Sequence, residues 1–205
     1  MSWSFRRPLA GTCLAAVLFA TAAQAQPLHV VPATSTPAAA AHESALPDHL
    51  RRQIVAYRTG EAPGTVVIDT ANTHLYLVLG NGRALRYGIG VGRDGFTWSG
   101  IKTIARKAEW PDWTPPQDML ARQPYLPRFM AGGPGNPLGA RAMYLSGSVY
   151  RIHGTNAPSS IGQHMSSGCI RMLNADVIDL YGRVGVGTKV MVLPDGPRTT
   201  RIASR

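Results

Sequence analysis

Short runs of apolar and polar residues, separated by turn-forming residues, dominate the middle of the chain. The segments 65–69, 74–79 and 84–92 are rich in β-branched and aromatic residues, and Gly80-Asn81-Gly82 separates the last two. This pattern predicts three strands joined by hairpins in an antiparallel sheet. Further strands are expected at 142–145, 148–154 and 188–194. Together these segments predict a mainly β fold.

Helical periodicity is limited to two places. Apolar residues recur at helical spacing over 48–57, which predicts a short helix against the domain. A second helix is expected to begin at Asn174, a good N-cap residue, and to end before Gly185. The segment 95–137 has many Pro, Gly and Trp residues and few aliphatic runs. It is expected to be either a functional loop or lid, or a surface connection whose Trp residues fill the core.

The ends of the chain differ in character from this middle region. Residues 1–25 combine Arg6 and Arg7, a short apolar run and the small-x-small sequence Ala23-Gln24-Ala25, which predicts a cleaved signal peptide and a periplasmic protein. The apolar run is too short for a stable membrane anchor, so no integral membrane segment is expected after cleavage. The remaining predicted parts are an Ala/Pro-rich tether with the short helix at 26–60, a catalytic domain at 64–193 and a basic, disordered tail at 194–205.

Charge and ligand patterning narrow the possible partners. The formal net charge is +10, but Lys and Arg are scattered and form no dense run. The charge therefore permits binding to an acidic polymer, and no nucleic-acid partner is predicted. No cluster of His, Cys, Asp and Glu has metal-ligand spacing, so neither a metal nor another cofactor is predicted.

Candidate chemistry concentrates in the stretch 150–172. Removal of the signal peptide would take Cys13 and leave Cys169 as the only thiol, in an oxidising compartment where such a residue is either buried or a working nucleophile. The polar turn around Cys169 favours a working nucleophile over a buried, inert thiol. His153, sixteen positions earlier at a predicted strand end, is the expected base, with His164 as the alternative. Backbone N–H groups at the turn that begins at Ser167 suit an oxyanion hole.

Several short motifs carry a family resemblance. They are IHGTN at 152–156, IG at 161–162, SSGCIRM at 166–172, DVIDLY at 176–181 and VGTKVMVL at 186–193. In order and spacing, the segment from about 64 to 193 resembles the YkuD-type L,D-transpeptidase catalytic domain, as found in exported proteobacterial members. The resemblance implies a β-sandwich-like domain with a short helix after the nucleophile turn. It also implies peptidoglycan cross-linking through a cysteinyl thioester, and a role in cell wall organisation and cell shape.

The resemblance also implies roles for individual residues. Cys169 matches the nucleophile, His153 the base, and the carbonyl of Gly154 the group that orients that base. Gly168 matches the glycine before the nucleophile. The residues assigned to substrate binding are Arg171, Ser167 and Tyr144. Arg171 suits a substrate carboxylate or, equally, an ordinary ion pair. Ser167 stands where many members have a histidine, which leaves open what this position contributes to substrate positioning.

Three functions are consistent with these residues. In the first, an amine of a peptidoglycan stem peptide, or an outer-membrane protein or lipoprotein, takes the acyl group from Cys169. In the second, water takes it, and the protein is an L,D-carboxypeptidase or another thiol peptidase of the cell wall. In the third, the Ser167 departure marks a catalytically inactive wall-binding module.

Overall fold

Eleven strands and four helical segments lie in the described part of the chain, which in this computed structural model comprises residue 1 and residues 46–194. The predicted signal peptide, most of the predicted tether and the predicted tail from residue 195 lie outside the described residues. The strands are β1 (Gln53–Ala56), β2 (Val66–Asp69), β3 (His74–Gly80), β4 (Arg83–Gly88), β5 (Val91–Gly92), β6 (Gly100–Glu109), β7 (Arg141–Leu145), β8 (Arg151–His153), β9 (His164–Ser166), β10 (Ile170–Arg171) and β11 (Lys189–Val192). The helical segments are η1 (Asp48–Leu50), α2 (Gln117–Arg122), η2 (Pro158–Ser160) and α3 (Asn174–Arg183).

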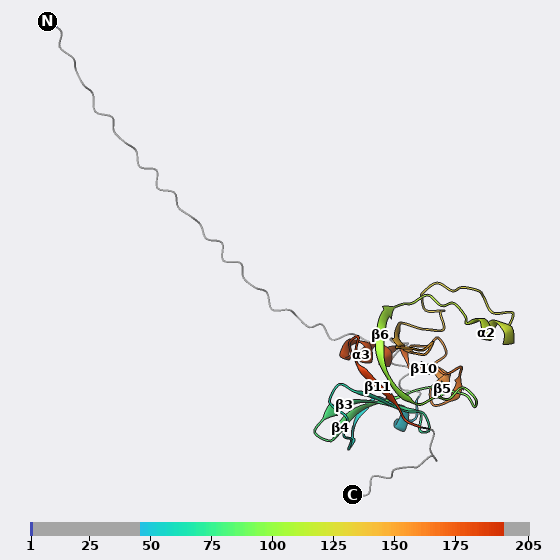
Figure 1. Ribbon diagram of the computed structural model, residues 1–205, viewed down its shortest axis with the longest axis horizontal. Coiled ribbons are helices and arrows are strands. Elements are labelled where there is room, and N and C mark those ends of the chain that lie inside the picture. Colours follow the sequence, from blue (N-terminus) through green and yellow to red (C-terminus); the bar gives the residue numbers. More distant parts are fainter. Residues whose placement is uncertain (2–45, 195–205) are drawn as a thin grey trace. The chain divides into compact units, whose positions relative to one another are not determined.

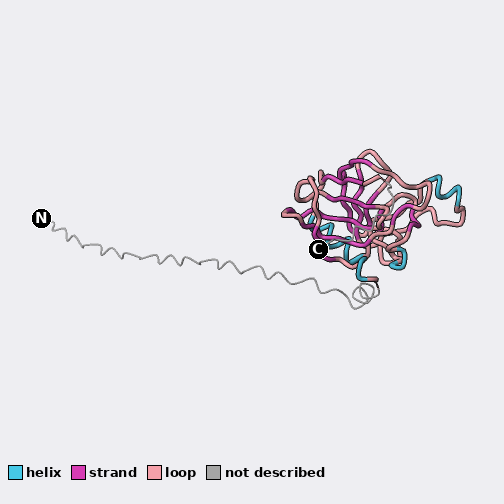
Figure 2. The backbone as a smooth tube through the Cα atoms, turned by 90° about the horizontal axis from the view of Figure 1, so that it is seen from below, coloured by secondary structure: helices cyan, strands magenta, loops and turns pink. Residues whose placement is uncertain are grey.

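Nine of the described strands form one mixed sheet in the order β1-β4-β3-β2-β11-β6-β7-β8-β10, and β5 pairs separately with β9. β11 is parallel to β2 and β10 is parallel to β8, whereas the other neighbours in the sheet are antiparallel. The first part of β6 pairs with β11 and the later part with β7, so β6 joins two halves of the sheet. Figure 2 shows the strands gathered together with the loops around them.

One hydrophobic core serves both halves of this sheet. It includes Val66 and Tyr87 from the first half and Met143 and Ile152 from the second, all with side chains fully removed from solvent. Because the two halves bury their apolar faces against the same core, the sheet packs as a sandwich. The prediction of a mainly β, sandwich-like domain is confirmed. The hairpin strands β2, β3 and β4 lie where the residue pattern places them, and so do β7, β8 and β11.

The prediction of a helix over 48–57 is wrong. Only the turn η1 forms there, and β1 then pairs antiparallel with β4. Leu50 is buried, but Ile54 is 59% exposed, so the apolar residues that suggested one helical stripe do not share a buried face. Pairing with the edge of β4 satisfies the backbone of this segment, and β-branched Ile54 and Val55 suit an extended conformation.

The segment 95–137 is less irregular than its composition suggests. It contains β6, whose ten residues include only one buried side chain, that of Ile104. A strand with so little apolar alternation gives no sequence signal, and it is held by hydrogen bonding to a neighbour on each side. After β6 the chain makes an excursion that carries α2, and Figure 1 shows α2 away from the sheet before the chain returns to β7.

The helix after the nucleophile turn, α3, is confirmed, but the capping role of Asn174 is not. Leu173 takes the N-cap position, without a side-chain cap hydrogen bond, and Asn174 is the first helical residue. Its Oδ1 instead accepts hydrogen bonds from the N–H groups of Ala140, at 2.9 Å, and Thr155, at 3.3 Å. Asn174 therefore ties the loop before β7 to the loop after β8. No described helix is long and apolar enough to cross a bilayer.

Candidate active site

Adjacent parallel strands bring Cys169 and His153 to the same face of the sheet. β10 pairs with β8 so that Ile170 lies opposite Ile152 and Arg171 opposite His153. Both isoleucines are buried in the core. Since neighbouring residues of a strand point to opposite faces, His153 points away from that core, as does Cys169, the residue immediately before β10.

His153 is held in one orientation by the backbone. Its side chain is buried, and its Nδ1 lies 2.6 Å from the carbonyl oxygen of Gly154. The Nδ1–H donates to this oxygen, which leaves Nε2 with a lone pair. Burial is the largest cause that lowers the pKa of His153, to about 3. The carbonyl of Gly154 opposes the shift, the charges of Arg171 and Arg151 add to it, and the backbone of Leu138 opposes it least. The imidazole is therefore neutral near pH 7.

Cys169 is half-buried, and its thiol is also neutral at rest. Burial raises the pKa of the thiol. Arg151 opposes this effect through its charge and through hydrogen bonds from its backbone and its side chain, and the charge of Arg171 acts in the same direction. The resting pair is thus a thiol and a neutral imidazole, with positive charge positioned to stabilise a thiolate once it forms.

The turn before Cys169 is fixed by a serine. The hydroxyl of Ser166 donates to the carbonyl oxygen of Cys169 at 2.6 Å, and its oxygen accepts from the N–H of Gly168 at 3.1 Å. The Gly168 N–H is therefore already engaged. Ser166 does not engage the N–H of Cys169, which is therefore the better candidate of the two for a substrate oxygen.

Two aromatic residues clamp the same turn. The indole N–H of Trp98 donates to the carbonyl oxygen of Gly168 at 2.8 Å. The Trp98 ring stacks on Tyr150 with centroids 4.8 Å apart and planes 6° apart. Gly168 has φ of +101°, and a Cβ there would run into the Tyr150 ring. This position therefore requires glycine for its conformation and for its close approach to the ring.

The other predicted residues lie in distinct places. Tyr144 lies on β7 with the guanidinium of Arg106 3.6 Å from its ring centroid. Arg171 lies on the face that carries His153, and burial lowers the pKa of its guanidinium. Ser167 is half-buried in the turn. His164, the alternative base, lies in β9, which pairs with β5 rather than joining the β8–β10 face.

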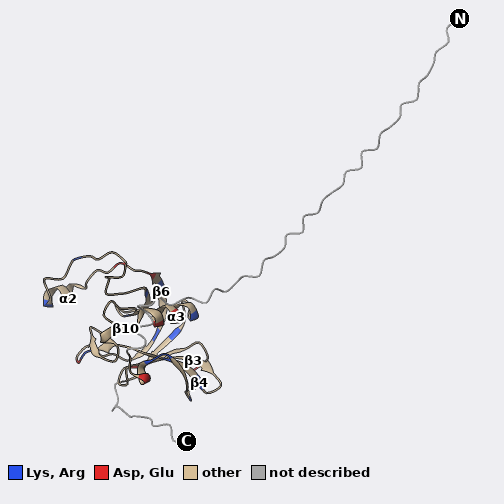
Figure 3. Cartoon of the chain, turned by 180° about the vertical axis from the view of Figure 1, so that it is seen from behind, with Lys and Arg blue, Asp and Glu red and all other residues tan. Residues whose placement is uncertain are grey.

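Sequence reasoning gave no role beside the thiol to Arg151 or Ser166, and it placed Trp98 only within a segment expected to be a functional loop or lid, or a surface connection. Arg151 could have been found, because it lies two residues before His153 on a predicted strand and so shares its face. Ser166 and Trp98 could not, because their roles depend on which backbone atoms the folded loops bring near them. Figure 3 shows Lys and Arg on several separate elements, among them β6 and α3, so charge alone does not single out this face.

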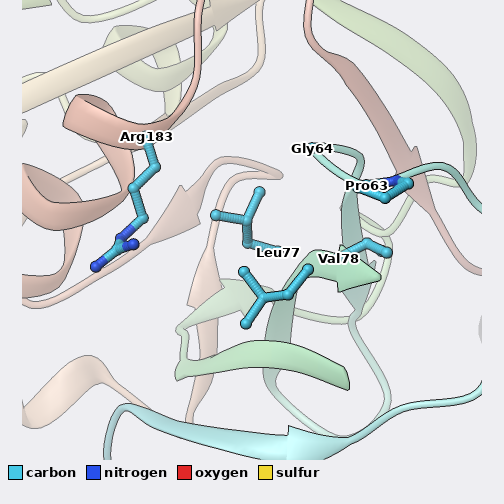
Figure 4. Close-up of a pocket in the computed structure, with 6 residues that line it drawn as sticks. Pro63, Gly64, Leu77, Val78 and Arg183 are labelled. Atoms are coloured by element: carbon cyan, nitrogen blue, oxygen red, sulfur yellow. The ribbon is translucent and has the colours of Figure 1, made fainter. Parts of the chain in front are cut away.

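Two further features lie outside this arrangement. No group of three or more potential metal ligands occurs among the described residues. A shallow open depression of about 370 Å³ lies between α3 and β3, lined by Pro63, Gly64, Leu77, Val78, Leu79 and Arg183. Figure 4 shows Arg183 approaching it from α3 and Leu77 from β3. None of the residues around Cys169 lines this depression, so it is separate from the candidate active site.

Comparison with known proteins adds an independent result. Residues 63–192 match the model of the YkuD family, the L,D-transpeptidase catalytic domain. The chain is 37% identical over 137 residues to a probable L,D-transpeptidase, ErfK/SrfK, of Escherichia coli K12, which covers 62% of this chain and 43% of that one. It is 34% identical over 145 residues to a putative L,D-transpeptidase, YqjB, of Bacillus subtilis 168, covering 67% and 76%.

A solved structure agrees with the fold. The catalytic domain of the E. faecium L,D-transpeptidase superposes with a TM-score of 0.51 at 20% identity, covering 66% of this chain and all of that one. The chain spans about half the length of the first curated relatives that it matches. Since the family match covers more than half of the chain and coincides with the sandwich that carries Cys169 and His153, the chain belongs to the YkuD family of L,D-transpeptidase catalytic domains.

Proposed function

We propose that this protein is a peptidoglycan L,D-transpeptidase in which Cys169 is the nucleophile and His153 the general base. One observation carries the proposal: the two side chains share a face of adjacent strands, and His153 is bound through Nδ1 to the carbonyl of Gly154. That hydrogen bond leaves Nε2 as the nitrogen that accepts the thiol proton. Family membership supports the choice of reaction.

The neutral resting pair determines how the first step runs. His153 Nε2 takes the proton from Cys169 as the sulfur attacks the carbonyl carbon of the L-centre–D-centre peptide bond in the donor stem. A C–S bond forms, and the negative charge moves to the former carbonyl oxygen. The Cys169 N–H donates to that oxygen, and the hydroxyl of Ser167 is a second candidate donor. The C–N bond then breaks, and the leaving amine takes its proton from the imidazolium.

The second step releases the acyl group to an acceptor. An amine attacks the thioester, His153 accepts its proton, and the sulfur leaves as a thiolate that is reprotonated. We propose a stem-peptide amine as acceptor, with an outer-membrane protein or lipoprotein as the second candidate. Water as acceptor would make the enzyme an L,D-carboxypeptidase. Mass spectrometry of products from isolated sacculi separates cross-linked, protein-linked and hydrolysed products.

We also propose that the protein acts in the periplasm after cleavage of residues 1–25. The Arg pair, the short apolar run and the Ala-x-Ala sequence of this segment support export. An exported location places the enzyme beside its peptidoglycan substrate, and there it would act in cell wall organisation and cell shape.

The mechanism is tested by replacing the nucleophile. Cys169→Ala should abolish cross-linking of stem peptides, and it should abolish the mass increase that a carbapenem gives by acylating the thiol. In the uncleaved chain, which retains residues 1–25, Cys13→Ala is the matched control, since it removes the other cysteine of the sequence and should change neither result. Cross-linking that survives Cys169→Ala would disprove the mechanism. A wild-type protein that no carbapenem acylates would favour an inactive wall-binding module.

A further inference from the structure

Two arginines beside Cys169, and a third further along the same sheet, have no carboxylate partner among the described residues. The first two are Arg151 in β8 and Arg171 in β10, and the third is Arg106 in β6. None of them forms a salt bridge with an acidic side chain in the part of the chain that the structure describes. Other arginines do, such as Arg183, which binds Asp179 through two nitrogens. Uncompensated guanidinium groups next to a nucleophile make this face attractive to anions.

Two of these arginines belong to a row that crosses three strands, β6, β7 and β8. Arg106 lies opposite Tyr144, and Tyr144 lies opposite Arg151. The neighbours of Tyr144 on β7, Met143 and Leu145, are buried in the core, so Tyr144 and its cross-strand partners point to the other face. The pairing of β8 with β10 continues the row to Cys169, which lies next to Arg151.

Tyr144 sets the orientation of the two guanidinium groups. They lie 3.6 Å (Arg106) and 5.5 Å (Arg151) from the centroid of its ring. A guanidinium packed on an aromatic ring keeps its N–H groups available at its edge, where they can bind both oxygens of a carboxylate. Tyr144 therefore acts as a positioning residue for the arginines.

Arg151 is the member of the row best suited to bind an anion. Its side chain is half-buried, and its Nε is buried with no hydrogen-bond partner. Its terminal nitrogen donates to the carbonyl of Val149 at 3.2 Å. A buried N–H without a partner is costly, and a bound carboxylate would satisfy it together with the charge.

We propose that Arg151, oriented by Tyr144 and assisted by Arg106, binds a carboxylate of the donor substrate next to Cys169. The site selects an acidic peptide whose carboxylate lies close to the bond that is attacked. The identity of that peptide as a peptidoglycan stem rests on the proposed function, but anion binding beside the thiol does not.

The test compares two reagents that alkylate the thiol and differ only in charge, iodoacetate and iodoacetamide. Both react with the same thiolate. The rate with iodoacetate divided by the rate with iodoacetamide therefore cancels any change in thiol reactivity at Cys169 and reports anion binding alone. Arg151→Gln should lower this ratio about tenfold, the effect of losing a charge-assisted hydrogen bond. Arg151→Lys, which keeps the charge without the planar fork, should lower it by less.

Matched variants control for net charge and for position. Arg58→Gln makes the same charge change at an exposed residue just after β1, at the opposite end of the sheet order, and should leave the ratio within about twofold of wild type. Tyr144→Phe keeps the ring and should preserve the ratio, whereas Tyr144→Leu removes it and should lower the ratio.

A second assay connects the site to the substrate. Arg151→Gln should raise the KM for an acidic stem peptide about tenfold. It should leave the KM for the same peptide with amidated carboxylates within about twofold. An unchanged reagent ratio in both Arg151→Gln and Arg151→Lys would overturn the proposal, whatever the peptide assay gives. A ratio that falls in a protein without transpeptidase activity would support the anion site and reject the proposed function instead.

Discussion

At the scale of single residues, the pKa values of Cys169 and His153 decide the type of thiol chemistry. A thiolate–imidazolium pair requires a low thiol pKa and a high imidazole pKa. Here burial shifts both in the opposite direction, raising that of Cys169 and lowering that of His153. Two groups whose neutral forms are both favoured do not exchange a proton at rest. Proton transfer must therefore accompany attack on the substrate.

This leads to a prediction about the pH dependence of alkylation. The rate of Cys169 modification by iodoacetamide should rise with pH to a midpoint above about 8.5, the pKa of an ordinary cysteine. His153→Gln should move this midpoint little, because a neutral imidazole contributes no charge. Measured rate–pH profiles of both proteins check this. A reactive plateau between about pH 4 and 8 that disappears in His153→Gln would instead reveal an ion pair.

At the scale of elements, three side chains fix the turn before β10. Two of them come from distant parts of the sequence, and the third belongs to the turn itself. Trp98 holds the carbonyl of Gly168, Tyr150 covers the α-carbon, and Ser166 bridges the ends of the turn. The nucleophile thus lies at the end of a turn, immediately before β10, whose backbone cannot rotate freely. This rigidity places the Cys169 N–H and the sulfur together, as an oxyanion site requires.

We predict that Gly168→Ala will destabilise the protein by two separable effects. Gly95 has φ of +79° and open space around it, so Gly95→Ala should cost only the conformational term of about 1 kcal/mol. Gly168→Ala adds the clash with Tyr150 and should cost about 2 kcal/mol more. Denaturant unfolding of both variants measures the difference. Equal losses would mean that the Tyr150 ring yields readily and does not clamp the turn.

At the scale of the whole molecule, the site depends on a core shared between the two halves of the sheet. β6 passes from one half to the other, and β11 lies between β2 and β6. The strands that carry the site, β8 and β10, are short, so their positions depend on this common core. The side chain of His153 is buried on the face opposite that core, and its protonation is therefore coupled to folding of the entire domain.

This coupling predicts how stability depends on pH. The pKa of His153 is about 3 in the folded protein and about 6.5 when unfolded, so between these values the unfolded state binds the extra proton. The contribution of His153 is present above pH 6.5 and is lost as the pH falls toward 3. Between pH 7 and pH 5 the free energy of unfolding should drop by about 2 kcal/mol from this residue.

Chemical denaturation at both pH values checks the assignment. His153→Gln cannot bind this proton, so its loss of stability between pH 7 and pH 5 should be smaller than that of wild type by the same about 2 kcal/mol. Parallel losses in the two proteins would show that His153 is not buried as a neutral group.

Local sequence pattern was sufficient for much of the fold. Short runs of apolar, β-branched and aromatic residues bounded by turn residues marked β2, β3 and β7, because such side chains suit an extended conformation and pack well in a sheet. β6 was not predicted, because its side chains are mostly exposed and its stability comes from hydrogen bonds to two neighbouring strands. β1 was mistaken for a helix because three apolar residues at helical spacing also fit a turn followed by an edge strand.

The sequence by itself determined the residue types that the chemistry needs: Cys169 in a small-residue turn, His153 at a strand end, and motifs around both that indicate the family. Only the tertiary structure decided their surroundings. Strand register, which depends on contacts between distant segments, aligned Arg151, Tyr144 and Arg106 in one row, and loop packing brought Trp98 to Gly168. A sequence pattern records which face of its own strand a residue takes. It does not record which residue of another strand will lie beside it.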